Sequence, residues 1–394
     1  MHLNRLSLTN FRAFSRLEMD ITGRILVLVG DNAQGKTSLL EAVYYLATFA
    51  SFQAGADRQM INFEALNEPL AVARIVAEYD RGGHPHRMEV RIIQEPVMPA
   101  GTRTRKEILL DGVKKSAAET VGQFSAVIFL PQMTRIIEGS PDDRRKFLNM
   151  ALCQAVPGYA RNLSDYSRVI TRRNALLKML AEGHGSPDQL IYWNNQLVSI
   201  GSEMVLARAL AVKQLEAHAS RLHLRLTGSM ERLSIRYQPA IDLDLAVSEE
   251  LTEDVVKTAF VNSLKRVQGE EIARGVTVCG PHRDDLHFLC NDLDLGDFGS
   301  RGQVRTAMLS LKLAEVNWMK AQTGEWPVLL LDETLAELDL HRRADLQETL
   351  QECDQGLLTT TDLHQFSDEF MAASTIWRVS AGCVNVERQT TMDA

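Results

Sequence analysis

The chain has 394 residues and a formal net charge of -8, from 43 Lys and Arg against 51 Asp and Glu. This balance excludes a histone-like protein, so any nucleic-acid binding must come from local basic patches. The length provides for two or three domains with sizeable cores and excludes disorder or a miniature scaffold.

The cysteine spacing and the lengths of the apolar runs indicate the redox state of the thiols and whether the chain spans a membrane. The five cysteines lie far apart, without a Cys-x-x-Cys pair, and this spacing indicates reduced thiols rather than a zinc site. No apolar run approaches about 18 residues, so we expect a soluble, cytoplasmic protein that spans no membrane.

The first 50 residues predict a strand hairpin, a buried strand and a helix. Apolar and polar residues alternate over 3–9 and again over 17–21, which is typical of two paired strands. Residues 25–29 are continuously apolar, as in a strand that is buried on both faces. A helical pattern follows over 37–49.

Residues 71–93 and 106–110 predict an antiparallel meander, with turns at 81–83 and 111–112. From 141 to 226 the apolar residues instead fall at helical spacing, with one break at 183–187. This pattern predicts a helical hairpin, either an ordinary amphipathic bundle or a functional arm.

The last part of the chain is mixed. Residues 232–270 favour no single assignment, and a strand-like pattern returns over 275–289. A helical pattern follows residue 303, and the apolar run 328–331 ends in a pair of carboxylates.

Residues 30–37 match the phosphate-loop pattern G-x-x-x-x-G-K-[ST], after a predicted buried strand and before a predicted helix. Backbone N–H groups of such a loop face phosphates, Lys36 reaches the β and γ oxygens, and the Thr37 hydroxyl binds Mg²⁺. An ordinary glycine-rich turn is the alternative. The residues predicted to bind ATP here are Gly30, Asp31, Asn32, Ala33, Gln34, Gly35, Lys36, Thr37 and Ser38.

Asp332 and Glu333 end the apolar run 328–331. Beside a phosphate loop, Asp332 would hold Mg²⁺ through water, and Glu333 would orient or deprotonate the attacking water. The alternative is a strand that ends in a solvated acidic turn.

The phosphate loop and the Asp332–Glu333 pair are separated by most of the sequence. A compact P-loop enzyme does not need so long a segment between these two motifs. We therefore predict an α/β fold, a P-loop head whose mixed sheet carries an antiparallel meander, with an inserted α-helical arm. The predicted bounds are 1–140 and 272–394 for the head and 141–271 for the arm.

Ser300 precedes a predicted helix in the segment Gly299-Ser300-Arg301-Gly302-Gln303. A serine hydroxyl, glycine N–H groups and a positive helix end form an anion site. Because the chain already has a phosphate loop, a second anion site suggests that it contacts the nucleotide of another subunit, so that ATP joins two heads. Taken alone, the pattern also fits a simple helix cap.

Several segments together resemble the RecF family of SMC-like ATP-binding-cassette ATPases, over nearly the whole chain. The segments are Asn10-Phe11-Arg12, the phosphate loop through Leu46, Gly139-Ser140-Pro141 with 144–148, Gly280–Asp285, Ser300–Gln303 with Arg305-Thr306, and Ala336–Asp339.

This resemblance implies an ATP-dependent homodimer that binds single-stranded and gapped duplex DNA, hydrolyses ATP slowly and weakly with DNA stimulation, and helps to load recombinase in gap repair and the SOS response. RecR, RecO and the recombinase filament are the implied partners, and nucleoid association on DNA is the implied location.

The resemblance also assigns roles to residues. It places Arg12 at a phosphate, Gln132 in the Q-loop that serves Mg²⁺ and catalysis, and Asp339 in the D-loop. Ser300, Gly302 and Gln303 match the signature motif, and residues 359–362 match a threonine-rich strand end. The chain departs from the family where Glu333 replaces an aspartate, where Ala336 replaces a serine, and at 51–53, which lacks a common arginine.

Basic clusters are the candidate DNA contacts, since a few Lys and Arg on one face suffice for sequence-independent binding. Solvated surface charge is the alternative. The foremost candidates are Arg103, Arg105, Lys106, Arg144, Arg145 and Lys146, followed by Lys114, Lys115, Arg172 and Arg173. For the polar cluster 282–285 we expect an ion-pair network that braces the head rather than catalysis.

Two other functions share part of the pattern. A cassette ATPase that drives a membrane transporter would have the same phosphate loop and carboxylates, and a structural SMC protein would need a far longer arm. We expect no nuclease activity, because the sequence offers no second reactive centre.

Overall fold

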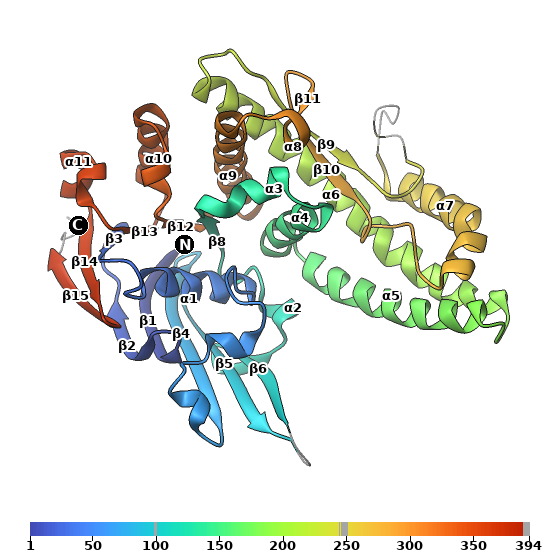
Figure 1. Ribbon diagram of the computed structural model, residues 1–394, viewed down its shortest axis with the longest axis horizontal. Helices are drawn as coiled ribbons and strands as arrows, with labels where there is room; N and C mark the ends of the chain where they lie inside the picture. Colours follow the sequence, from blue (N-terminus) through green and yellow to red (C-terminus); the bar gives the residue numbers. More distant parts are fainter. Residues whose placement is uncertain (98–100, 244, 246–250, 389–394) are drawn as a thin grey trace. The chain divides into compact units, whose positions relative to one another are not determined.

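The structure, a computed structural model, describes residues 1–97, 101–243, 245 and 251–388. The chain divides into two compact units, Met1–Met133 with Glu315–Ala394, and Thr134–Ala314 (Figure 1). This division by compactness differs from the predicted head and arm, because residues 272–314 belong to the second unit. The functional domain bounds stay a prediction.

The first unit contains an antiparallel sheet in the order β2-β1-β4-β5-β6-β7. Its strands are β1 (His2–Phe11), β2 (Phe14–Asp20), β4 (Ala71–Arg81), β5 (His84–Pro96), β6 (Thr102–Leu110) and β7 (Val113–Lys115). Met88, Val90 and Ile92 alternate along β5 and are buried, as period-two patterning requires. The predicted hairpin and meander are confirmed.

A second sheet in the same unit has the order β15-β14-β3-β13-β12-β8. Its strands are β3 (Ile25–Val29), β8 (Ala126–Phe129), β12 (Val328–Asp332), β13 (Gly356–Thr360), β14 (Thr375–Ser380) and β15 (Cys383–Arg388). β3 pairs in parallel with both β13 and β14, and β12 pairs in parallel with β13 and β8. The two predicted apolar runs are thus central strands of one sheet.

Helix α1 (Lys36–Thr48) contacts β4 of the first sheet and β8, β12 and β13 of the second. Its sequence is apolar on most faces, and Leu39, Leu40, Val43 and Leu46 are fully buried in the core that it shares with both sheets. The unit also contains α2 (Ala117–Thr120), α10 (Leu340–Glu352), α11 (Asp368–Ala372) and, from Glu315 on, the last part of α9 (Arg301–Thr323). The burial of α1 fixes the loop that precedes it.

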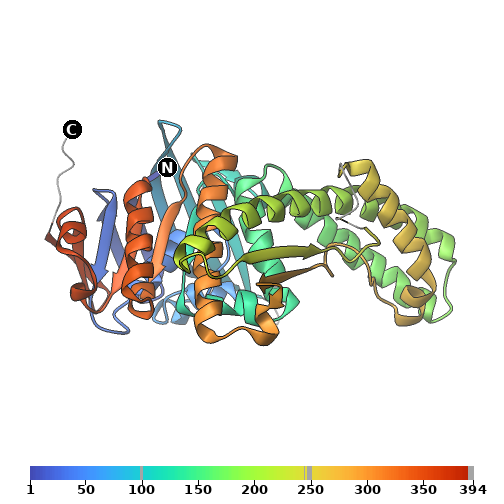
Figure 2. The ribbon, with the colours of Figure 1, turned by 90° about the horizontal axis from the view of Figure 1, so that it is seen from above.

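The second unit is mainly helical, with α3 (Arg135–Glu138), α4 (Pro141–Ala155), α5 (Tyr159–Ala181), α6 (Leu190–Leu226) and α7 (Glu253–Arg274). α5, α6 and α7 contact one another and run side by side (Figure 2). α6 has 37 residues and is therefore about 56 Å long at 1.5 Å per residue. The predicted helical hairpin is confirmed as α5 and α6.

A small sheet, β11-β10-β9, completes this unit with β9 (Leu233–Gln238), β10 (Asp285–Cys290) and β11 (Leu293–Asp294). α8 (Leu295–Phe298) and α9 (Arg301–Thr323) follow. The strand expected from 275 is wrong over 275–284, because Gly275 and Gly280 take positive φ and the Thr277 side chain between them bonds to Arg173 and Asn174 of α5. Among the described residues, no helix is long and apolar enough to cross a membrane.

Candidate nucleotide-binding site

The loop between β3 and α1 is shaped by its glycines. Gly35 has φ 104°, and a Cβ there would lie 3.0 Å from the Phe14 ring. A Cβ on Gly30 would lie 2.2 Å from the Val379 carbonyl oxygen, closer than any side chain can approach. The two glycines therefore let the loop turn tightly against β14 and the β1–β2 hairpin.

Lys36 begins α1, and its side chain is only 4% exposed. Its Nζ donates to the carbonyl oxygens of Gly30 (2.7 Å) and Asp31 (3.0 Å) and lies 3.2 Å from Glu333 Oε1. The loop thus curls around its own ammonium group. A phosphate at the loop would meet a fixed positive charge and the positive end of α1.

Thr37 and Asp332 meet at the ends of neighbouring elements. The Thr37 hydroxyl lies 2.9 and 3.0 Å from the two Asp332 carboxylate oxygens, and Thr359 Oγ1 donates to Asp332 Oδ1 at 2.7 Å. Burial raises the pKa of Asp332, which the two hydroxyl hydrogen bonds partly oppose. A hydroxyl and a carboxylate oxygen are ligands that suit Mg²⁺, so these residues fit the predicted cation.

Glu333 follows directly in the left-handed region, with φ 49°. Its N–H donates to Thr359 Oγ1 at 3.1 Å, which holds this turn in place. A non-glycine residue in this conformation costs about 1–3 kcal/mol, so the surrounding bonds must hold it in place. The turn places the Glu333 carboxylate beside Lys36, at the cavity where the predicted water would react.

These residues surround one cavity of about 430 Å³. Of the predicted site, Asn32–Ser38, Gln132, Asp332 and Glu333 line it, and Gln132 is exposed there. Gly30 and Asp31 contribute through their carbonyl groups. Ala13 and Gln53 also line the cavity; sequence reasoning missed them because they come from loops whose course depends on the tertiary fold.

Arg12 has a different environment from the one predicted. Its Nε and Nη2 each donate to the Glu41 carboxylate at 2.7 Å, and Nη1 donates to the Gln59 carbonyl oxygen. Glu41 is fully buried and also accepts from Ser51. The only sequence signal for this pair is a glutamate within the apolar run of α1. The contact of Arg12 with phosphate stays a prediction.

The signature residues lie in the second unit, at the start of α9. Ser300 N donates to Gln303 Oε1 at 3.0 Å, and Gln303 N donates to Ser300 Oγ at 3.2 Å, a reciprocal capping box. Ser300 and Gly302 are exposed, and a Cβ on Gly302 would meet only Ser300 Oγ, at 4.0 Å. Asp339 similarly caps α10 through the N–H of Arg342. The surface at Ser300 is open to a ligand.

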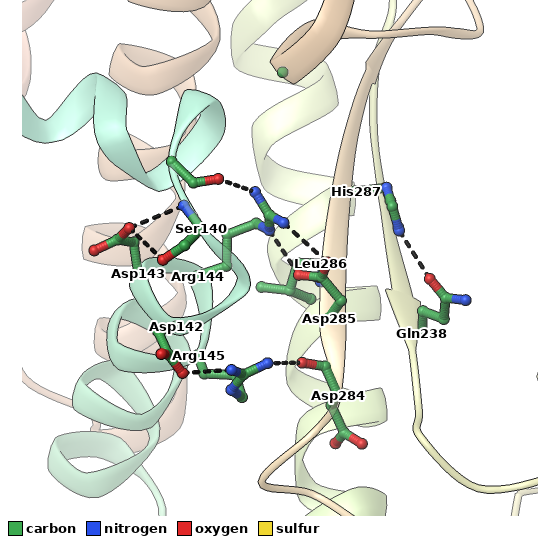
Figure 3. Close-up of polar contacts among 12 residues, drawn as sticks. Ser140, Asp142, Asp143, Arg144, Arg145, Gln238, Asp284, Asp285, Leu286 and His287 are labelled. Carbon is green, nitrogen blue, oxygen red and sulfur yellow. Dashed lines mark hydrogen bonds and ion pairs between the residues drawn. The ribbon is translucent and has the colours of Figure 1, made fainter. Parts of the chain in front are cut away.

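Several predicted DNA contacts are occupied by internal ion pairs. Arg144 forms a bidentate pair with Asp285, at 2.6 and 2.9 Å, and Arg145 donates to the Asp284 carbonyl oxygen and to Asp142 (Figure 3). Lys146 is exposed beside them. Arg144 and Arg145 therefore join α4 to β10 in this structure.

The basic cluster of the first unit shows the same behaviour. Arg105 pairs with Glu95 and Glu107, while Lys106 lies over the Tyr45 ring and pairs with Asp57. Arg103 is exposed on β6. Of the secondary candidates, Lys114 pairs with Glu107, Arg173 is buried against Glu271, and Lys115 and Arg172 are exposed.

The cluster 282–285 forms the expected polar network, within the second unit rather than in the predicted head. The buried Asp284 carboxylate accepts from Arg208 (2.7 Å), from Tyr237 and from the Ala240 N–H (2.8 Å). His282 lies 3.0 Å from the Tyr166 hydroxyl. These bonds connect α5, α6, β9 and the start of β10, which is a bracing role.

This network makes stability depend on pH. Burial lowers the pKa of His282 to about 4, whereas an unfolded histidine titrates near 6.5. Between these values the unfolded chain binds the extra proton, so acidification should cost the folded unit up to about 2 kcal/mol at pH 5. Urea midpoints at pH 7 and 5 would test this. The difference should shrink in His282→Asn and persist in the exposed control His184→Asn; equal differences in both variants would contradict it.

The buried parallel sheet, the phosphate loop and the Asp332–Glu333 pair define a P-loop ATPase head of the ATP-binding-cassette type. Residues 2–383 match the family described as the RecF/RecN/SMC N terminal domain. The chain belongs to the RecF family of DNA replication and repair proteins. A cassette ATPase of membrane transport is not favoured.

The relatives are similar over their full length. The DNA replication and repair protein RecF of Roseiflexus castenholzii is 37% identical, covering 97% of this chain and 99% of its own. That of Chloroflexus aurantiacus is 36% identical, covering 98% and 99%. A solved structure of the recombination mediator protein RecF with ATP, in the RecFOR pathway, is 27% identical with TM-score 0.84 and 98% coverage of both chains. An SMC head bound to ScpA, at 14% identity and TM-score 0.52, shares the fold.

Proposed function

We propose that this protein is an ATP-dependent DNA-binding switch of recombinational repair, in which Mg²⁺-ATP joins two copies on DNA and slow hydrolysis releases them. The observation that carries the proposal is the convergence of Lys36, Thr37, Asp332 and Glu333 on one cavity. The solved relative whose description names ATP supports the choice of nucleotide.

Each residue has a distinct task in this switch. Lys36 holds the β and γ phosphates, and Thr37 and Asp332 hold Mg²⁺, which neutralises phosphate charge when bound. Gln132 is exposed and lines the same cavity, where it contributes a polar side chain. Glu333 accepts the proton of the attacking water, because its carboxylate lines the same cavity beside the phosphate-binding Lys36.

The exposed Ser300 turn supports a role in a second subunit. Its hydroxyl and the N–H groups at the start of α9 offer an anion site that nothing in the described part of its own unit covers. Gly302 leaves room for a close approach. In this proposal the turn contacts the γ-phosphate held by the partner's phosphate loop, with Asp339 near the same interface.

DNA binding in this proposal depends on the exposed cations Arg103, Lys146, Lys115 and Arg172 rather than on the internally paired arginines. The resemblance supports single-stranded and gapped duplex DNA as ligands and RecO, RecR and a recombinase filament as partners. The solved RecF relative belongs to the RecFOR pathway, which supports RecO and RecR as partners. Because the matched family acts on DNA, we also expect the protein in the cytoplasm, at the nucleoid when bound.

The first test is the solution mass by light scattering, with ATP and with ADP. We expect ATP, and not ADP, to double the mass of the wild type, and Ser300→Arg to prevent doubling while it still binds nucleotide. Ser116→Arg is the matched control, because Ser116 also forms a capping box, with Glu119, at an exposed helix start. A mass that never changes, even with DNA, would refute the two-headed switch.

A further inference from the structure

Three metal-ligand side chains from separate segments converge inside the second unit. They are His223 on α6, Glu231 in the loop before β9, and Cys290 at the end of β10, and their ligand atoms all lie within 4.8 Å of one another. His223 and Cys290 are buried, and the Glu231 side chain is 24% exposed. The cluster is thus enclosed but reachable from solvent through Glu231.

The hydrogen bonds of Ser310 fix the orientation of the His223 ring. Ser310 Oγ donates its single hydrogen to the Thr306 carbonyl oxygen at 2.8 Å, so towards His223 Nδ1, 3.1 Å away, it can only accept. This arrangement favours the tautomer with the proton on Nδ1. In the neutral ring this leaves the Nε2 lone pair directed at the cluster, as in metal-binding histidines.

Glu231 faces this lone pair with a lone pair of its own. Its Oε2 lies 3.4 Å from His223 Nε2, while its Oε1 accepts from Gln303 Nε2 at 2.9 Å. Two acceptors at that distance repel unless a cation lies between them, either a proton on the imidazole or a metal ion. The thiol of Cys290 completes a third side of the same space.

We propose that His223, Glu231 and Cys290 bind one divalent transition-metal ion of the zinc type. Imidazole, carboxylate and thiolate together match zinc better than Mg²⁺ or Ca²⁺, and three protein ligands leave one position for water. Ligand bonds of about 2.0–2.3 Å require the side chains to close by about 1 Å. On binding, the Cys290 thiol loses its proton to solvent and the sulfur bonds to the metal.

The site connects to the signature turn through Gln303. Because Gln303 bonds both Glu231 and the N–H of Ser300, an ion that fixes Glu231 also fixes the residue that closes the Ser300 capping box. Metal binding itself does not depend on the proposed ATP switch. It can therefore be tested without nucleotide or DNA.

Cobalt(II) titration of the full chain is the decisive experiment, since a thiolate ligand gives Co²⁺ a strong near-ultraviolet charge-transfer band. We expect one equivalent to produce this band, and excess Zn²⁺ to remove it. Cys290→Ser should abolish the band, and His223→Gln should weaken binding at least about 10-fold. Cys279→Ser, another buried cysteine of the same unit, is the control and should keep it. No band, or a band that survives Cys290→Ser, would overturn the proposal.

Two further measurements avoid the risk that these buried variants misfold. In the wild type, Zn²⁺ should slow alkylation of Cys290 and leave the rate at Cys279 unchanged; equal rates at Cys290 with and without Zn²⁺ would overturn the site. Ser310→Ala, which removes the partner of Nδ1 and keeps all three proposed ligands, should weaken Co²⁺ binding about 10- to 100-fold while the band persists. An unchanged affinity would show that Ser310 does not position the ring, and would remove the tautomer argument on which the proposal depends.

Discussion

Replacing Lys36 by alanine is expected to weaken Mg²⁺-ATP binding at least about 100-fold and to abolish ATP-induced pairing. The substitution removes a nearly buried ammonium group and leaves the Glu333 carboxylate, 3.2 Å away, without its counter-charge beside the phosphates. Calorimetric titration with Mg²⁺-ATP measures the first effect, and light scattering measures the second.

Lys320→Ala is the matched control for Lys36→Ala. Lys320 belongs to the same unit, and its ammonium group lies over the Trp326 ring, away from the cavity. Its loss should leave ATP affinity within about 2-fold. If Lys36→Ala bound ATP as tightly as this control, the cavity between β3, α1 and β12 would not be the nucleotide site.

Glu333→Gln should trap the ATP-bound dimer, whereas Lys36→Ala prevents the dimer from forming. The substitution keeps the shape of the Glu333 side chain and removes only its charge and basicity. Hydrolysis is expected to fall about 10²- to 10⁴-fold, the usual contribution of a general base, while ATP still binds beside Lys36. The dimer should then accumulate with ATP. Phosphate release in a single turnover and the solution mass test both parts.

The control for this variant is Glu352→Gln, an exposed carboxylate at the end of α10. Glu352→Gln should hydrolyse ATP at the wild-type rate, and its dimer should dissociate at the wild-type rate. A Glu333→Gln protein that binds ATP and remains a monomer would contradict the assignment of Glu333. Normal hydrolysis by Glu333→Gln would place the base elsewhere.

Elements with a strong local pattern could be predicted from the sequence. The apolar runs 25–29 and 328–331 are central strands, and the three-four spacing over 163–211 is the α5–α6 hairpin. Residues 275–284 could not be predicted, because their apolar alternation is overridden by two positive-φ glycines and by bonds to distant helices. The hydrogen-bond partners of the polar residues in this segment are distant in sequence and are set by the tertiary fold.

The nucleotide site follows the same rule. The phosphate loop is local in sequence, and Asp332–Glu333 could be joined to it because a phosphate loop requires a second acidic element at the end of another buried strand. The partners of Arg12 and Arg144 could not be found, since Glu41 and Asp285 carry no pattern that connects them to these arginines. The proximity of His223, Glu231 and Cys290 could not be predicted from cysteine spacing either, because the three residues come from a helix, a loop and a strand that only the tertiary fold brings together.

The position of β3 between β13 and β14 has a consequence for how the protein is made. Both strands that flank β3 are synthesised long after it, because β13 and β14 follow β3 by more than 300 residues. At about 5–20 residues per second, β3 waits on the order of tens of seconds for its neighbours. During that interval an apolar strand has unpaired edges, so we expect nascent chains of this protein to need chaperone protection until residues 356–380 emerge.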